Sequence, residues 1–265
     1  MDVDIKRPLA RHHAVITGGG RGIGAAIAEA LARSGASISL VGRNSEVLLA
    51  TAERIKNSYG VKVATASADV ADEAAVRRAL AALGNALGAP TILINNAGVA
   101  VSAPFLKADA EFWRKVLDTD LMGAVYCTQA VLPAMLEAKW GRIINIASTA
   151  GLAGSAYITA YCAAKHGLIG LTRALAVETA RTGVTVNAVC PGYVDTEMTA
   201  QNVANIMKKT GRSRDEVVAS LVGGNPQGRL IQPAEVADAV IWLCGDNALS
   251  VTGQSIVIAG GEIQQ

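Results

Sequence analysis

The sequence predicts an α/β fold in which one doubly wound, parallel sheet of seven strands carries helices on both faces. Short β-branched runs alternate with alanine-rich helical stretches along the chain, which is the pattern of strands joined by helical crossovers. The strand runs are almost wholly apolar, as strands covered on both faces should be. No shift in composition marks a second domain, so residues 1–265 are interpreted as a single domain.

The predicted elements follow one another in strict alternation. A strand over 13–18 leads to a helix that Gly35 closes, because glycine readily adopts the left-handed conformation that ends a helix. The next strand leads to a helix whose N-cap is assigned to Ser45. The run 109–140 is long enough for one bent helix or two. The remaining strands are predicted over 37–42, 62–70, 91–98, 142–148, 184–192 and 255–261, and the other helices over 22–35, 45–60, 72–88, 160–178 and 233–246.

One long stretch, 193–228, shows no clear periodicity and is predicted to be irregular. A loop of that length inside a compact α/β domain usually acts as a lid or a binding segment. We therefore expect a substrate lid over about 193–228.

Composition favours burial of the chain against other subunits. Apolar residues make up 51% of the chain and charged residues only 17%, which fits either subunit contacts or contact with a membrane. No stretch of 18 apolar residues lacks a charge, so we expect no membrane-spanning helix. The net charge of +2 provides no field suited to nucleic acid, so no nucleic-acid partner is expected.

The N-terminus and the cysteines indicate a cytoplasmic protein without a bound metal. Residues 1–15 carry acidic side chains and no apolar segment, unlike a secretory signal. The four cysteines form no CxxC pair and no cysteine–histidine cluster. We interpret them as buried free thiols in a reducing compartment. They are Cys127, Cys162, Cys190 and Cys244.

A glycine-rich turn follows the first predicted strand. Gly18, Gly22 and Gly24 have the spacing G-x-x-x-G-x-G and, together with Ile23, open the first helix. In a strand–turn–helix unit, such glycines let the backbone approach a pyrophosphate over the helix N-terminus. The motif therefore predicts dinucleotide binding, with a glycine-rich turn that binds nothing as the alternative.

The end of the second strand favours NADP(H) over NAD(H). Folds that prefer NAD place an acidic residue there to bind the ribose 2′-hydroxyl, whereas this chain has Arg43. An arginine pairs with a 2′-phosphate, and Arg21 in the glycine turn provides a second cation. NAD(H) remains possible, because both arginines could be solvated surface charges.

Tyr161 and Lys165 lie four residues apart in an apolar helical run, so they share one helix face. A free tyrosine has a pKa of about 10, and a neighbouring ammonium favours the phenolate and lowers that pKa. The spacing therefore puts a cation beside the phenol, and a phenol and an ammonium on one helix face need a chemical reason.

Several separate motifs occur in one order along the chain: TGGGRGIG at 17–24, Asp69, NNAG at 95–98, Ser148, YCAAK at 161–165 and PGYVDTEM at 191–198. Together they resemble the short-chain dehydrogenase/reductase family over Thr17–Gly261, and Ser148 lies 13 residues before Tyr161, the usual offset. The resemblance implies a Rossmann-like fold and an NAD(P)-dependent oxidoreductase.

The resemblance implies a role for each matching residue. Tyr161 would be the general acid in carbonyl reduction and the base in alcohol oxidation. Lys165 would lower its pKa and hold the nicotinamide ribose, and Ser148 would hydrogen-bond the substrate carbonyl. The further cofactor-binding residues implied are Asp69 and the Val70 backbone at the adenine, Asn96 and Gly98 at the ribose, Val194 (through its backbone) and Thr196 at the nicotinamide carboxamide, and also Pro191 and Gly192. Turn chemistry is the alternative for Asp69 and Asn96.

Asp120 departs from the family pattern, because many members carry an asparagine 28 residues before the serine. In the family this asparagine helps to hold a water that relays protons to the lysine. An ionised Asp120 accepts hydrogen bonds from such a water but donates none. Either the relay persists with a carboxylate and a changed pH dependence, or activity is weakened.

The substrate class follows from resemblance to 3-oxoacyl thioester reductases and polyketide ketoreductases. We expect a small ketone or acyl thioester to be reduced to a secondary alcohol, with Tyr157 as a pocket wall. A secondary-alcohol dehydrogenase working oxidatively and a non-catalytic dinucleotide-binding regulator are the alternatives. We expect an adaptable apolar pocket wall made by Met198, Met207 and Leu221. The basic side chains of the lid either contact the phosphates of a carrier arm or coenzyme A, or form a solvated face; they are Lys208, Lys209, Arg212 and Arg214.

Assembly is also implied by the family. In its members the helix with the tyrosine, the long helix before it and the C-terminal segment commonly pack against other subunits. Low charge and high apolar content agree with that arrangement. We therefore expect a homotetramer with two-fold symmetry.

Overall fold

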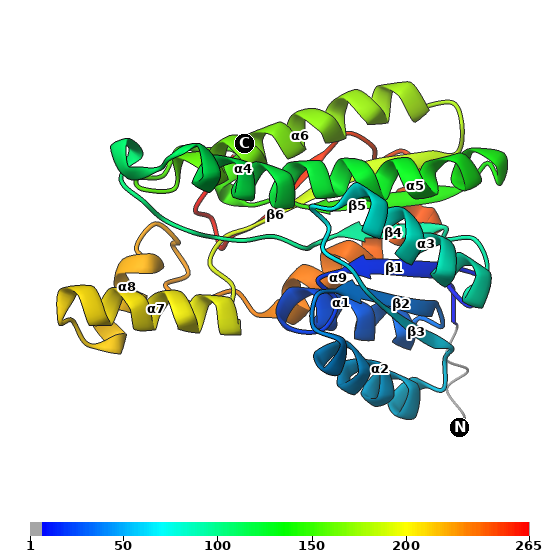
Figure 1. The fold of residues 1–265 in the computed structure, drawn as a ribbon, viewed down its shortest axis with the longest axis horizontal. Helices are drawn as coiled ribbons and strands as arrows, with labels where there is room; N and C mark the ends of the chain where they lie inside the picture. The colour runs from blue at the N-terminus through cyan, green and yellow to red at the C-terminus, as the bar shows by residue number, and fades with distance from the viewer. Residues whose placement is uncertain (1–6, 265) are drawn as a thin grey trace.

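A computed structural model describes residues 7–264. Its centre is one parallel sheet of seven strands in the order β3-β2-β1-β4-β5-β6-β7 (Figure 1). The strands are β1 (His13–Thr17), β2 (Ser37–Gly42), β3 (Val63–Ser67), β4 (Ile92–Asn95), β5 (Gly141–Ile146), β6 (Val184–Pro191) and β7 (Ser255–Ile258). The predicted fold class, a doubly wound sheet in a single domain, is confirmed.

Helices cover both faces of the sheet (Figure 1). Contacts join α1 to α9 and to α2 on one face, and α3 to α5 and α4 to α6 on the other. The helices are α1 (Gly22–Arg33), α2 (Ser45–Tyr59), α3 (Glu73–Leu87), α4 (Ala110–Leu117), α5 (Gly123–Glu137), α6 (Thr159–Thr179), α7 (Glu197–Thr210), α8 (Arg214–Leu221) and α9 (Pro233–Cys244).

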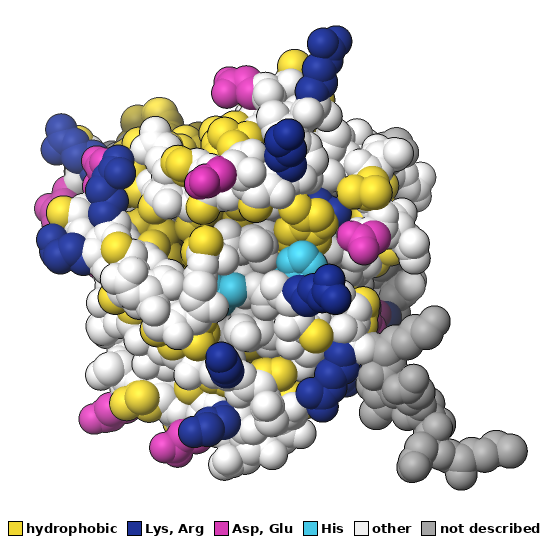
Figure 2. All heavy atoms as spheres, turned by 90° about the vertical axis from the view of Figure 1, so that its right-hand side faces the viewer, with side chains coloured by type: hydrophobic (Ala, Val, Ile, Leu, Met, Phe, Trp, Pro, Cys, Tyr) yellow, Lys and Arg dark blue, Asp and Glu magenta, His cyan; other side chains and the backbone are white. Residues whose placement is uncertain are grey.

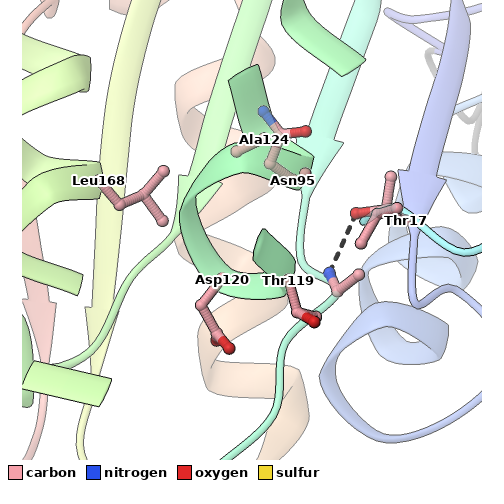
Figure 3. Close-up of a pocket in the computed structure, with 9 residues that line it drawn as sticks. Thr17, Asn95, Thr119, Asp120, Ala124 and Leu168 are labelled. Carbon is pink, nitrogen blue, oxygen red and sulfur yellow. Dashed lines mark hydrogen bonds between the residues drawn. The ribbon is translucent and has the colours of Figure 1, made fainter. Parts of the chain in front are cut away.

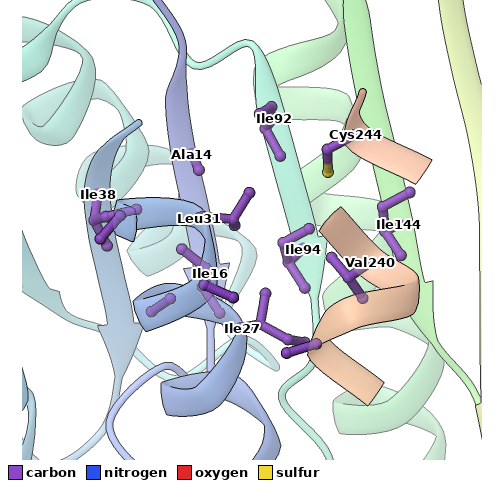
Figure 4. Close-up of a cluster of buried hydrophobic side chains, with 14 of the residues drawn as sticks. Ala14, Ile16, Ile27, Leu31, Ile38, Ile92, Ile94, Ile144, Val240 and Cys244 are labelled. Carbon is purple, nitrogen blue, oxygen red and sulfur yellow. The ribbon is translucent and has the colours of Figure 1, made fainter. Parts of the chain in front are cut away.

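The core forms two layers because successive strand residues point to opposite faces of the sheet. In β1, Ile16 faces α1 and α9, where it packs in one cluster with Ile27 and Val240 (Figure 4). Val15, its neighbour in the strand, belongs to the opposite cluster together with α3 and α5 side chains. This two-sided burial explains why the strands read as continuous apolar runs.

The stretch 193–228 is not irregular as predicted, because it contains the helices α7 and α8. The Thr196 side chain caps α7 by accepting from the Thr199 N–H, and Ser213 forms a capping box with Glu216 at α8. Few residues of either helix are buried, so the pair contributes little to the core. In Figure 1 the pair projects from the body of the molecule.

The start of α2 differs from the prediction, and the structure decides between the two interpretations of the run 109–140. Asn44, not Ser45, caps α2, because its side chain accepts the Val47 N–H at 3.2 Å. The run 109–140 forms α4 and α5 joined by a π-helical turn over Asp118–Met122, so the backbone stays helical throughout. π-helical turns widen a helix by one residue and occur frequently at functional sites.

One face of the molecule carries charges of both signs. Figure 2 shows Lys and Arg side chains interspersed with Asp and Glu on the face that lies at the right of Figure 1. Within residues 7–264, no helix combines the length and apolarity needed to cross a membrane.

Candidate active site

The predicted motifs converge at the carboxyl ends of the parallel strands. The glycine turn follows β1, the NNAG segment follows β4, Ser148 follows β5, and Pro191 ends β6. The order of the sheet reverses between β1 and β4. Open α/β sheets bind their ligands in the crevice at such a switch point.

The backbone of the glycine turn requires its glycines. Gly18 and Gly22 have φ of 63° and 55°, a left-handed conformation that disfavours other residues. A Cβ on Gly24 would lie 2.3 Å from the Gly18 carbonyl oxygen. Arg21 precedes α1 without a side-chain hydrogen bond to its first turn. The helix therefore presents its first N–H groups without a capping side chain, which fits the pyrophosphate of a dinucleotide.

A network of hydrogen bonds ties the glycine turn to the segment after β4. The Thr17 hydroxyl accepts the N–H groups of Asn96 and Ala97 at 2.9 and 3.0 Å. The Asn96 amide donates to the Thr17 and Gly18 carbonyls at 2.9 and 3.2 Å. Asn96 thus holds the glycine turn in place, as the alternative interpretation of this residue as turn chemistry expects. Thr17, which also holds this turn, was not among the predicted site residues.

The two predicted phosphate-binding arginines do not lie together. Arg43 Nη1 lies 3.9 Å from Asp69 Oδ2, and its side chain is 69% exposed. Arg21 Nη1 instead lies 3.2 Å from Glu197 Oε2 at the start of α7. Arg43 is therefore placed beside the predicted adenine contact, whereas Arg21 connects the glycine turn to the stretch 193–228.

The remaining predicted cofactor residues surround the glycine turn or support it. Val194 is buried, and its carbonyl accepts the Thr199 hydroxyl at 2.6 Å. A Cβ on Gly22 would lie 3.3 Å from the Thr196 methyl group, so α7 begins directly against the glycine turn. Val70 is buried under α5, and Ile23, in the first turn of α1, packs against the core.

Ser148, Tyr161 and Lys165 come together where β5 meets α6. Ser148 starts a tight turn over Thr149–Gly151, and its hydroxyl accepts the Ala150 N–H at 3.1 Å. A Cβ on Gly151 would lie 2.8 Å from the Lys165 carbonyl oxygen, so this turn packs closely on α6. The Lys165 ammonium lies 5.5 Å from the centre of the Tyr161 ring.

Asp120 holds the Lys165 ammonium in a buried ion pair. Lys165 Nζ lies 3.3 Å from Asp120 Oδ1 and donates to the Ile146 carbonyl at 3.0 Å. The Asp120 carboxylate also accepts the Val99 N–H, at 3.0 Å for Oδ2. A Cβ on Gly98 would lie 2.5 Å from Asp120 Oδ1, so Gly98 leaves room for this carboxylate.

The π-helical turn places Asp120 next to a small buried cavity. The cavity has a volume of about 10 Å³ and is lined by Thr17, Asn95, Thr119 and Asp120 among others (Figure 3). That volume is close to the space one water requires. Asn95, which also lines the cavity, has a buried Oδ1 without a hydrogen-bond partner among residues 7–264.

The pKa of Tyr161 shifts in the direction opposite to the one predicted. Burial raises the pKa of its phenol, and the Asp120 charge adds to the rise, whereas Lys165 and a hydrogen bond from Ser148 oppose it. The pKa of Lys165 is raised, because Asp120 and Tyr161 outweigh the effect of burial. Burial raises the pKa of Asp120 itself, against the effect of Lys165. The spacing in the sequence identified the lowering of the Tyr161 pKa by Lys165. It did not identify the rise of that pKa caused by burial, which is larger.

Two side chains at the end of β6 and after β7 were not predicted from the sequence. Burial raises the pKa of Tyr193, and the charges of Glu262 and Tyr161 raise it further. Tyr193 stands inside the PGYVDTEM motif, which was a usable signal, whereas Glu262 follows the last strand in a segment without a motif. Tyr157, the predicted pocket wall, is 64% exposed, and its carbonyl accepts the Ala103 N–H.

Comparison with known proteins shows the family to which the chain is related. The family described as short chain dehydrogenase matches residues 12–206. The chain is 38% identical to 3-oxoacyl-(acyl-carrier-protein) reductase FabG of Aquifex aeolicus over 247 residues, which is 93% of this chain and 95% of that protein. It is 36% identical to D-beta-hydroxybutyrate dehydrogenase of Rhizobium meliloti over 251 residues, 94% and 97% of the two chains.

Among solved structures, the fold is similar to a variant of actinorhodin polyketide ketoreductase with NADPH. The TM-score is 0.91 at 37% identity, covering 95% of this chain and 97% of that one. The similarity therefore extends over nearly the whole length of both proteins.

Proposed function

The chain belongs to the short-chain dehydrogenase/reductase family, and from that premise we propose that it is an NADP(H)-dependent oxidoreductase that reversibly reduces a 3-oxoacyl thioester or a similar ketone to a secondary alcohol. The observation that carries the proposal is the convergence of Ser148, Tyr161 and Lys165 beside the glycine turn at the carboxyl edge of the sheet.

Each of these side chains has a definite part in ketone reduction. Bound cofactor supplies the hydride. The Tyr161 hydroxyl donates its proton to the carbonyl oxygen, and the raised pKa keeps this phenol protonated at neutral pH. The Ser148 hydroxyl donates a hydrogen bond to the same oxygen. Two donors of the Lys165 ammonium are used by Asp120 and Ile146, which leaves the third for Tyr161 or a ribose hydroxyl.

The assay that tests this function follows NADPH oxidation with an acetoacetyl thioester, ethyl acetoacetate and aryl ketones. Two alternatives have specific support. The relative named D-beta-hydroxybutyrate dehydrogenase favours a secondary-alcohol dehydrogenase working oxidatively. Asp120, at the position of the usual asparagine, favours a non-catalytic regulator, which would bind NADPH and reduce none of these ketones.

Replacing Arg43 is expected to weaken the binding of NADPH more than the binding of NADH. Arg43→Ala should raise the KM for NADPH about tenfold, the effect of losing one exposed charge-assisted contact to the 2′-phosphate. The KM for NADH, which lacks that phosphate, should change by less than about twofold. Steady-state kinetics with both cofactors measure the ratio.

Arg78→Ala on α3 is the matched control, because Arg78 is also an exposed arginine but lies far from the glycine turn. Equal changes with both cofactors in Arg43→Ala would contradict NADP(H) selection by this residue.

Removing the charge of Asp120 is expected to move the pH profile of ketone reduction. The Asp120 carboxylate raises the pKa of Tyr161, so Asp120→Asn should lower that pKa. Reduction needs the protonated phenol and is lost as pH rises through its pKa, so the alkaline limb should move to lower pH. Turnover at neutral pH should stay within about tenfold, or ~1.4 kcal/mol of barrier.

Profiles of kcat/KM against pH for both proteins make this comparison. Asp118→Asn, in the same π-helical turn but without a contact to Lys165, is the control. An unmoved alkaline limb in Asp120→Asn would remove Asp120 from control of Tyr161.

We also propose that α7 and α8 form the substrate lid over about 193–228. Met198 at its base is 49% exposed and supports an apolar pocket wall. Lys208, Lys209 and Arg214 are exposed and free to meet phosphates of a carrier arm or coenzyme A. Salt-sensitive binding of coenzyme A thioesters would support this contact, and equal affinity for the simple esters would contradict it.

The assembly that we propose is a homotetramer in the cytoplasm. Val177 on α6 is 79% exposed, and a Cβ on Gly170 would meet no atom within 4 Å. Trp242 and Leu249 add exposed apolar surface near the end of α9, at 48% and 57%. All four cysteines are free thiols, as a reducing compartment favours. A light-scattering mass equal to one chain would contradict the assembly.

A further inference from the structure

Glu262, in the C-terminal segment after β7, lies between the end of β6 and the return from α8. A Cβ on Gly192 would lie 2.8 Å from Glu262 Oε2, and a Cβ on Gly224 would lie 3.5 Å from Glu262 Cγ. Glycines on both sides therefore leave the space that this side chain fills. Gly192 directly follows Pro191 at the carboxyl end of β6, so the carboxylate sits at the edge of the sheet where the active site lies.

The segment that carries Glu262 is held in one conformation. Gly260 and Gly261 have φ of 60° and 92°, and the Glu262 N–H donates to the Ala259 carbonyl at 3.2 Å. Asn225 packs so closely on Gly260 that a Cβ there would lie 2.1 Å from Asn225 Oδ1. The same Asn225 amide donates to the Arg229 carbonyl at 2.9 Å. The tail is thus fixed to the end of the proposed lid, and the position of Glu262 with it.

The Glu262 carboxylate is uncompensated. Within residues 7–264 it has no ion pair and accepts no hydrogen bond, and it is half-buried. The ammonium of Lys165 is engaged by Asp120. Tyr193, which is 39% exposed, experiences the charges of both Glu262 and Tyr161. Glu262 therefore brings a negative charge to the carboxyl end of β6, beside Gly192, which is the neighbour of Tyr193 in the chain.

We propose that Glu262 determines substrate specificity by excluding carbonyl compounds that carry a free carboxylate and by favouring neutral esters and thioesters. This inference rests on the proposed ketone reduction and adds the charge of the substrate to it. A substrate carboxylate beside Glu262 would be repelled in a partly buried site, where water screens charges weakly. Specificity of this kind arises from a repulsive element rather than from an added contact.

The test compares acetoacetate, which carries a free carboxylate, with methyl acetoacetate, in which a neutral ester replaces that carboxylate. Wild-type protein should have the higher kcat/KM for the ester. Glu262→Gln keeps the shape of the side chain and removes its charge, so it should raise kcat/KM for acetoacetate about tenfold. The value for the ester should stay within about twofold. Glu53→Gln, an exposed glutamate on α2, removes the same charge far from the site and should change neither value.

Two outcomes separate the inference from the function on which it rests, and a second variant covers a failure to fold. An unchanged ester-to-acetoacetate ratio in Glu262→Gln, with ester reduction intact, would overturn the role of Glu262 and leave the proposed function standing. No reduction of either compound by wild-type protein would contradict the function and the inference together. If Glu262→Gln does not fold, Glu262→Met provides the same comparison, and a raised acetoacetate preference there supports the proposal equally.

Discussion

Replacement of Tyr161 by phenylalanine is expected to lower kcat for ketone reduction by at least about 10³-fold, because general acid catalysis contributes up to about 10⁴. The change removes one hydroxyl and keeps the ring, which packs in a cluster with Val116, Ala160 and Ala164. The fold and the glycine turn should be unaffected, so the Kd for NADPH should stay within about twofold. Steady-state kinetics and fluorescence titration with NADPH measure the two quantities.

Tyr126→Phe on α5 is the control, since it removes a phenol that packs in the core away from Ser148 and Lys165. Its kcat should match that of the wild type. If Tyr161→Phe kept more than about a tenth of the wild-type kcat, Tyr161 would not be the proton donor.

Replacement of Lys165 by methionine is expected to destabilise the protein and to abolish turnover. The Lys165 and Asp120 side chains are only 5% and 0% exposed. Removing one partner of a buried ion pair leaves the other charge uncompensated, which costs about 3–5 kcal/mol. Urea denaturation should therefore show a free energy of unfolding lower by about that amount.

The double variant Lys165→Met/Asp120→Asn separates stability from catalysis. It removes both charges, so it should recover most of the lost free energy of unfolding, because a buried pair replaced on both sides is often neutral. Turnover should remain abolished, since the ammonium beside Tyr161 is still absent. Additive losses of stability in the two single variants and the double would contradict the buried ion pair.

Much of the fold was predictable because strands buried on both faces leave an unmistakable apolar pattern. Ile16 and Val15, adjacent in the sequence, face different helices, and no polar residue was needed to tell strand from helix. Helix α7 was missed although Val203, Ile206 and Met207 have the i, i+3, i+4 spacing of one helix face. The helix buries only Thr199 and Val203, so it adds little to the core, and its start depends on the Thr196 cap.

In the candidate site, too, the motifs could be predicted from the sequence, whereas features that depend on tertiary packing could not. The order of the motifs indicates the family to which Ser148, Tyr161 and Lys165 point. The parallel sheet of that family brings the three residues to one edge. The direction of the Tyr161 pKa could not follow from a spacing of four, because burial depends on the whole fold. The position of Glu262 could not be found from sequence, since it depends on packing against Gly192 and Gly224, which are far away in the chain.

The most direct test mixes wild-type protein with NADPH and an acetoacetyl thioester, and measures NADPH oxidation together with the product. A protonated Tyr161 beside Lys165 should give one 3-hydroxyacyl thioester for each NADPH consumed. Tight binding of NADPH with no oxidation by the thioester, by ethyl acetoacetate or by any aryl ketone would contradict the central claim.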